Sequence, residues 1–512
     1  MKKSKKTITS PPKDQTQKKP DNPFSDTLNR MMTRRQAIST VGKVVIGAAV
    51  GAVAAGGIAE TYFATTPGKV TTATQTVSST FNPADYATQA PGSKFLIGNI
   101  SIVLALEVST IFDHGASQAA AALGLDYKTI DAGGGDPSTS VAAARSLISQ
   151  GAKGILSFAI DPAAVPQVAR LCQDNKVFYS SWWSIQPFQY PWNTGPYYLK
   201  FGFQDCETDE LAVDTLMFQK LKNAGKTDAH VINIMGTANL PSNAIKDMGI
   251  AEAWQNTLPT AQLVSHPYGM WDLATAETDM QNALATDPNI LGVTTNNDSM
   301  TAGAILGAQN KGVDVGPYAT GVDGQTAFMQ LMTQGHGLAT ACFNPAYIYG
   351  LGVAELYDAI TGQFYPADKD RLACTNDLLV VADVNEAKSL AQQANFQLPF
   401  KVVAASDYNK KVYPNGANST YPWNWKLMSH GKAKELGLTY DITGGTGWGG
   451  EHSYVDALGG ADVFSEYILD SVNRYANLNA NTVADLSKAP FAATAASPNK
   501  STYNWYKSNP PT

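Results

Sequence analysis

Apolar runs alternate with amphipathic stretches along the central part of this chain. Three of the runs, at 95–104, 154–160 and 290–296, contain few polar positions. That pattern is typical of parallel strands that are covered by helices on both faces. The stretch 138–150, between the first two runs, has the spacing of an amphipathic helix. A second series of the same kind starts after Asp205, so the sequence predicts an α/β fold with two doubly wound parallel-sheet lobes.

The alternation ends near residue 385. Residues 385–512 are rich in Gly, Asn and aromatic side chains, as in the segment TGGTGWGGEHSY at 443–454. Disordered tails lack such aromatics. We therefore expect a C-terminal extension of irregular structure packed on a core, and the sequence assigns no function to it.

The N-terminal part has the organisation of an exported protein. Residues 1–31 form a basic tail, 32–64 join the pair Arg34 and Arg35 to a mild apolar run, and 65–93 are rich in Thr and Ser. Adjacent arginines before an apolar run indicate the twin-arginine export route, although an ordinary signal anchor remains an alternative. If uncut, the run is near the ~20 residues that span a bilayer. We expect a cytoplasmic tail, an export signal or membrane anchor, and a linker that tethers an exported part at the cell surface or in a periplasm-like space.

Charge excludes one class of partner. The 512 residues contain 37 Lys and Arg against 43 Asp and Glu, but ten of the basic residues and only three of the acidic ones lie in residues 1–35. The exported part therefore carries a net charge of about −13. Nucleic-acid binding depends on basic patches that displace counterions from phosphates, so we expect no nucleic-acid partner.

The sequence gives little support to a metal site or an enzyme. It has six His and no H-E-x-x-H motif, and its four cysteines lack C-x-x-C spacing. Disulfides and buried free thiols both remain open for these cysteines. Glu451 and Asp456 could be chosen as a glycosidase pair, but no catalytic constellation supports them. We expect no metal, no cofactor and no enzymatic activity. The cysteines are Cys172, Cys206, Cys342 and Cys374.

Three segments carry a resemblance to a known family. They are SLISQGAKGILSFAIDPAAV at 146–165, TTNNDSMTAGAILGAQNKG at 294–312 and TGVDGQTAFMQLMTQGHGLATACFNPAYIYGLGVAEL at 320–356. Over roughly residues 94–384 the chain resembles the extracellular monosaccharide-binding proteins of ABC importers, the ribose/galactose/xylose-type group. The family's N-D-x-M-A-x-G-A, G-x-D-G and N-P-Y-like motifs have counterparts in order, with Thr301 replacing the first Ala and Ala346 the Tyr.

The resemblance implies a type I periplasmic-binding-protein architecture. Its first lobe would comprise 94–204 and 344–384 and its second lobe 205–343, joined by a hinge of three crossing strands. One monosaccharide would bind in the cleft and be delivered to the ABC permease subunits in the membrane after hinge closure. A sugar-sensing receptor of the same fold, which signals to a membrane partner, is the alternative.

The residues suited to bind a sugar follow the predicted strands. Trp182 and Trp183 end the run 176–183, Trp271 lies after 262–267, and Asn297 and Asp323 directly follow strands. Ligands in such sheets bind outside the carboxyl ends of the strands. Aromatic faces suit the C–H surfaces of a sugar, and planar amide or carboxylate groups suit its hydroxyls. Core packing of each Trp, and helix capping by Asn297 or Asp323, remain alternatives.

By resemblance, Asn297 and Asp323 match hydroxyl-binding residues of the family and Trp271 its stacking aromatic. Other positions differ from the family. Ser181-Trp182-Trp183 replace an Asp-Arg pair, Asn243 lies near the place of an Arg, and Phe343 replaces a Gln. In LALEVST, Glu107 is the remaining polar contact. The expected ligand-binding residues are therefore Glu107, Trp182, Trp183, Asn243, Trp271, Asn297, Asp323 and Phe343.

Overall fold

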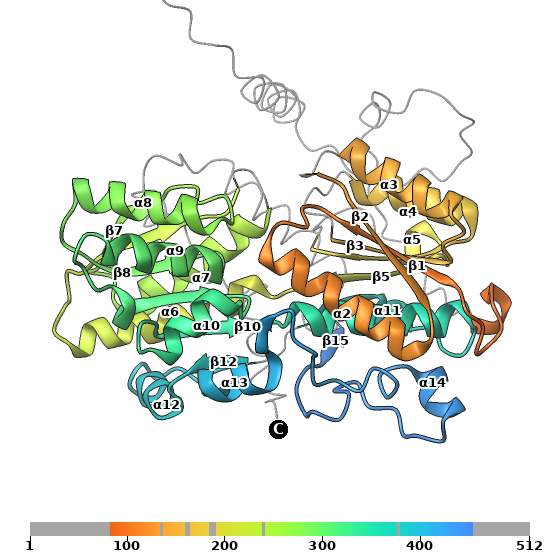
Figure 1. The fold of residues 1–512 in the computed structure, drawn as a ribbon. Coiled ribbons are helices and arrows are strands. Elements are labelled where there is room, and N and C mark those ends of the chain that lie inside the picture. The colour runs from red at the N-terminus through yellow and green to blue at the C-terminus, as the bar shows by residue number, and fades with distance from the viewer. Residues whose placement is uncertain are drawn as a thin grey trace, which may run out of the picture. The chain divides into compact units, whose positions relative to one another are not determined.

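The structure of this chain is a computed structural model, and Figure 1 shows its fold as a ribbon. The predicted tail, the export segment and most of the linker lie outside the described residues, as does the end of the C-terminal extension. Among the described helices, none combines the length and the apolar character that crossing a membrane requires. The described residues are 82–133, 137–158, 164–183, 191–237, 241–375 and 379–453.

The first lobe is built on a seven-stranded sheet with the order β15-β11-β5-β4-β3-β1-β2. Its neighbouring strands are parallel except for β15, which runs antiparallel to β11. The strands are β1 (Leu96–Ser101), β2 (Asp126–Asp131), β3 (Gly154–Phe158), β4 (Phe178–Trp182), β5 (Tyr198–Phe203), β11 (Leu372–Thr375) and β15 (Glu451–Ser453).

The second lobe is built on another seven-stranded sheet, with the order β13-β12-β10-β9-β8-β6-β7. Here β10 and β12 are antiparallel and the other neighbours are parallel. The strands are β6 (His230–Ile234), β7 (Gln262–Ser265), β8 (Ile290–Thr295), β9 (Ala319–Val322), β10 (Ala339–Cys342), β12 (Leu379–Ala382) and β13 (Lys401–Val403).

Helices connect most of these strands, and side-chain caps fix several helix starts. Asp205, Asp272 and Asn297 each accept a hydrogen bond from a backbone N–H in the first turn of the next helix. The main helices are α2 (Glu107–Leu123), α3 (Pro137–Ser149), α4 (Ala164–Asn175), α6 (Cys206–Asn223), α7 (Pro241–Thr257), α8 (Leu273–Thr286), α9 (Asp298–Gln309), α10 (Thr326–Thr333), α11 (Pro345–Ile360), α12 (Val384–Gln393), α13 (Ala405–Val412) and α14 (His430–Glu435). The shorter elements are η1 (Pro83–Tyr86), α5 (Pro191–Thr194), η2 (Gly316–Tyr318), η3 (Asp368–Arg371) and β14 (Pro414–Ala417).

The described chain changes sheet four times. It does so between β5 and β6, between β10 and β11, between β11 and β12 through residues outside the described ranges, and between β13 and β15. The prediction of an α/β fold with two parallel-sheet lobes is confirmed. The boundary placed at residue 384 is wrong, because β12 pairs with β10 and therefore belongs to the second lobe.

The C-terminal extension contains more regular structure than its composition predicted. Elements α12, β13 and α13 join the second lobe, and β15 completes the sheet of the first lobe. Between them lies an aromatic cluster on α11, in which the ring centroids of Trp423 lie 5.6 Å from those of Tyr347 and Trp425. Asp358 of α11 accepts hydrogen bonds from Ser429 Oγ and from the backbone N–H of His430, at the start of α14. Residues 385–453 of the extension are therefore an integral part of both lobes.

The end of the predicted linker also packs on the first lobe. The backbone N–H groups of Thr88 and Gln89 donate to the carbonyl of Ile360, and that of Gly92 donates to the hydroxyl of Tyr357. Residues 82–93 therefore belong to the folded part, although their composition predicted a stalk.

Candidate ligand-binding site

A cavity of about 40 Å³ lies between residues of the two lobes. Because one water needs about 10–15 Å³, it has room for a few waters, so a sugar ring would require its walls to separate. The cavity lies where β3, β4, β8 and β9 end, which is where such sheets bind ligands. It is lined by Leu106, Val108, Phe158 and Trp183 from the first lobe and by Ser242, Trp271, Asn297 and Asp323 from the second.

Three of the lining residues have a strained backbone. The φ angle is 71° at Trp183, 62° at Trp271 and 99° at Asp323. A residue with a side chain in this left-handed region costs of order 1–3 kcal/mol, and such strain concentrates at functional sites. The strain here shows that the surrounding structure holds these side chains in the cavity at a cost in stability.

The two indoles of the cavity come from different lobes and have free N–H groups. Within the described part of the chain, Nε1 of Trp183 and Nε1 of Trp271 are buried without a hydrogen-bond partner. The ring of Trp271 lies directly on Gly236, where a Cβ atom would overlap it. Buried unpaired donors are rare in folded proteins, so both groups are available to a bound ligand.

Asn297 and Asp323 each combine a structural bond with a place in the cavity wall. Asn297 Oδ1 accepts from Met300 N at 2.9 Å, which caps α9, and Asn297 Nδ2 donates to the carbonyl of Trp271 at 3.3 Å. Asp323 Oδ2 accepts from Gln325 Nε2 at 3.4 Å. Asn297 is therefore both a helix cap and a lining residue, so the two interpretations made from the sequence do not exclude each other.

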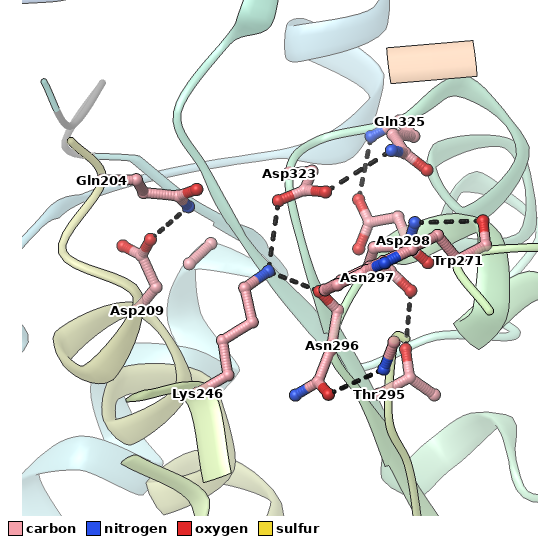
Figure 2. A network of polar contacts seen from close by, with 12 residues as sticks. Gln204, Asp209, Lys246, Trp271, Thr295, Asn296, Asn297, Asp298, Asp323 and Gln325 are labelled. Atoms are coloured by element: carbon pink, nitrogen blue, oxygen red, sulfur yellow. Dashed lines mark hydrogen bonds and ion pairs between the residues drawn. The ribbon is translucent and has the colours of Figure 1, made fainter. Parts of the chain in front are cut away.

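Lys246 is the residue that sequence reasoning missed. It is fully buried on α7, and Figure 2 shows its ammonium group between Asp323 and Asn296. Nζ lies 3.5 Å from Asp323 Oδ1, donates to the carbonyl of Asn296, and lies 5.4 Å and 5.7 Å from the ring centroids of Trp183 and Trp271. The available signal was a lysine one turn after Asn243, in the helix that follows the first strand of the second lobe.

Burial and the ion pair act on the two charges in opposite directions. Burial raises the pKa of Asp323 above its ordinary value, and the Lys246 ammonium partly offsets this. Burial alone would lower the pKa of Lys246, but Asp323 and other nearby acidic groups outweigh it, so that pKa is raised. Lys246 therefore stays a cation beside Asp323.

Trp182 does not line the cavity, in contrast to the expectation. It is buried in the first lobe, where its ring lies on Gly202 and where Lys200 Nζ is 5.8 Å from its centroid. Successive residues of a strand point to opposite faces of the sheet. Trp182 ends β4 facing the core, and Trp183 is the one that reaches the cavity.

Phe343 packs against Trp183 outside the cavity lining. It is fully buried, and its ring centroid lies 5.6 Å from that of Trp183 and 6.0 Å from that of Phe112. Its place is therefore to hold Trp183, and it is absent from the cavity lining.

Asn243 and Glu107 also lie beside the cavity rather than on its wall. Asn243 Nδ2 donates to the carbonyl of Thr237, and its Oδ1 is buried without a partner in the described part of the chain. Glu107 Oε1 accepts from Thr326 N at 3.0 Å and from the Thr326 hydroxyl. Both expected contacts are thus engaged with the protein itself.

A metal-binding arrangement is absent from the described ranges, in which no group of three or more His, Cys, Asp or Glu could hold an ion. Cys172 and Cys206 are buried free thiols, and Cys342 is buried with its Sγ beside the hydroxyl of Tyr408. The side chain of Cys374 lies outside the description.

Comparison with known proteins identifies the family. A family model described as a periplasmic binding protein domain matches residues 107–364. The D-allose-binding periplasmic protein of Escherichia coli (strain K12) is 29% identical over 167 residues, which cover 32% of this chain and 52% of that protein. The chain thus spans about half the length of that curated relative.

Solved structures show the same fold. A twin-arginine translocation pathway signal protein from Burkholderia phytofirmans is 20% identical with a TM-score of 0.51, covering 60% of this chain and 95% of that one. A Mycobacterium smegmatis protein in complex with β-D-fucofuranose is 17% identical with a TM-score of 0.50, covering 59% and 95%.

The family model covers about half of the chain and includes every lining residue of the cavity except Leu106. Its members have a solute-binding fold, are generally non-enzymatic and are exported to the periplasm. This chain belongs to the periplasmic binding protein family.

Proposed function

We propose that this chain is the substrate-binding component of an ABC transporter, which captures a monosaccharide between its lobes and delivers it to the permease. The observation that carries the proposal is the composition of the cavity. Indoles from both lobes present free N–H groups in a wall that also contains the carboxylate of Asp323 and the amide of Asn297. The ammonium of Lys246 lies 3.5 Å from that carboxylate, outside the lining.

These groups meet the needs of a sugar in a dry site. The indole faces suit its C–H surfaces, and the buried carboxylate and donors suit its hydroxyls. Because charged partners make the stronger hydrogen bonds, Asp323 and Lys246 would supply most of the orientation. The walls come from two lobes, so ligand contacts would draw the lobes together and give the permease a closed form to recognise.

The N-terminal segment supports export by the twin-arginine route and tethering at the membrane. Arg34 and Arg35 precede the apolar run, and the similar Burkholderia protein carries a twin-arginine description in its name. Tethering would keep the binding protein near its permease. Immunoblots of cell fractions with and without a functional twin-arginine translocase test this, and unchanged export in its absence would contradict the route.

Thermal unfolding of the purified chain with pentoses, hexoses and disaccharides tests the main proposal, with D-allose included because a similar protein binds it. A ligand that binds the folded state raises the melting temperature. At a free ligand concentration of one hundred times Kd, the free energy of unfolding increases by about 2.7 kcal/mol. We expect a monosaccharide to do so and isothermal titration to give a one-to-one complex. If no monosaccharide shifts the melting temperature, the proposed function is wrong.

A further inference from the structure

The charge at the cavity is carried by one buried pair. Lys246 Nζ and Asp323 Oδ1 lie 3.5 Å apart, with Lys246 fully buried and Asp323 at 5% exposure. The Lys246 ammonium also lies near the rings of Trp183 and Trp271, which come from opposite walls. A ligand that stacks between these indoles would therefore meet the carboxylate of Asp323 in the cavity wall, with the ammonium of Lys246 3.5 Å from it.

The other carboxyl groups around the pair lie outside the cavity lining, in which Asp323 is the acidic residue. Burial raises the pKa of Asp209 and of Glu210 on α6, and of Asp298 on α9, well above their ordinary values. Asp247, on α7 next to Lys246, accepts from Asn233 Nδ2 and lies 3.4 Å from His266 Nε2. From the first lobe, Glu107 is engaged by Thr326. The pair thus sets the charge that a ligand meets.

Resting on the proposed function, we propose that the Lys246–Asp323 pair selects uncharged sugars, with Asp323 rejecting sugar acids and Lys246 rejecting amino sugars. The pair is neutral as a unit. A charged ligand would have to leave water without a free counter-charge, which is costly in a buried site. It would also place a like charge beside one member of the pair, where the low dielectric strengthens repulsion.

Removing one member of the pair should reverse the selection. Lys246→Met leaves the carboxylate of Asp323 unpaired in a cavity wall that also contains two indoles, and this combination favours an ammonium group. Asp323→Asn leaves an unpaired ammonium that favours a carboxylate. The double variant removes both charges, so that neither Lys246 nor Asp323 is left as an uncompensated buried charge. It should again favour the neutral sugar.

The experiment measures galactose, galactosamine and galacturonate, with the matching glucose series, by isothermal titration at about pH 7, where the amine is mostly protonated and the carboxylate ionised. We expect the wild-type chain to favour the neutral sugar at least tenfold. Lys246→Met should shift the preference at least tenfold toward the amino sugar, and Asp323→Asn should shift it as far toward the sugar acid.

Matched controls use exposed residues of the second lobe, Lys311→Met and Asp228→Asn, which should keep the wild-type order. The double variant and the melting temperature of every variant separate lost folding from lost selectivity. Variants that keep the wild-type order of the three sugars, or a wild-type chain that binds a charged sugar as tightly as the neutral one, overturn this inference and leave the proposed function standing. A wild-type chain that binds none of these sugars, and none of those screened above, contradicts the proposed function itself.

Discussion

Glu107 and Thr326 join the two lobes directly. Glu107 is the first residue of α2 in the first lobe, and its carboxylate accepts hydrogen bonds from the backbone N–H and the hydroxyl of Thr326, the first residue of α10 in the second lobe. A carboxylate at a helix N-terminus is also favoured by the helix dipole. This contact holds the first turns of α2 and α10 together beside the cavity without any contribution from a ligand.

Glu107→Ala should therefore favour the open form. The charged hydrogen bonds are worth about 1.5–3 kcal/mol, so we expect a larger radius of gyration in solution scattering without ligand and a weaker sugar affinity. Thr326→Val removes the hydroxyl but keeps the backbone N–H, and should give a smaller effect in the same direction. Scattering curves identical to the wild type for Glu107→Ala would show that the contact does not hold the lobes.

Asp323→Ala should weaken sugar binding by about 2 kcal/mol or more, because the ligand hydroxyls lose a charged partner in a dry site. Isothermal titration with the sugar found in the screen measures this. Asp228→Ala, on the exposed surface of the same lobe, serves as the control. Unchanged affinity in Asp323→Ala would show that the cavity is not the binding site.

Gly236→Ala should displace the indole of Trp271, because the added Cβ would overlap its ring. We expect sugar affinity to fall on the order of tenfold, equivalent to about 1.4 kcal/mol, together with a shift in tryptophan fluorescence. Gly450→Ala is the matched control, since its Cβ would meet open space. Retained affinity and an unchanged spectrum would mean that Trp271 contributes no contact to the ligand.

Stability should be greatest in acid and fall as the pH rises. Burial raises the pKa of Asp205 to about 6 and the pKa of Asp214 and of Asp358 to about 7. These groups keep protons in the folded state that the unfolded chain releases above about pH 4. Their contribution is present below that pH and is lost as the pH rises through the folded values, at about 1.4 kcal/mol per pKa unit.

Melting temperatures between about pH 4 and pH 8 test this, with an expected decline across the range. Asp214→Asn should flatten the profile, because the titrating proton is gone while the amide oxygen can still accept from one of the two hydroxyls, of Thr294 or Thr320, and the amide N–H can donate to the other. A melting temperature that rises from acid to neutral pH would contradict the expectation.

The cavity residues that could be predicted are those that directly follow strands. Asn297 follows β8 and Asp323 follows β9, and an apolar run with a helix after it is enough to locate both. The sequence predicted both Trp182 and Trp183 as binding residues. It could not distinguish them, because this requires knowing which face of the sheet each side chain occupies. That face is decided by pairing with β3 and β5, which the local pattern does not contain.

The amino-acid pattern by itself determined the fold class, the two series of strands and helices, and the strand ends where a ligand would bind, because these depend on local periodicity. Only the tertiary structure decided that Lys246 is a buried cation, that Glu107 bonds Thr326 instead of lining the cavity, and that β12 belongs to the second lobe. Each of these depends on groups far apart in the chain, as with Lys246 and Asp323, which are 77 positions apart. The sequence around a lysine does not show which distant carboxylate will compensate its charge when it is buried.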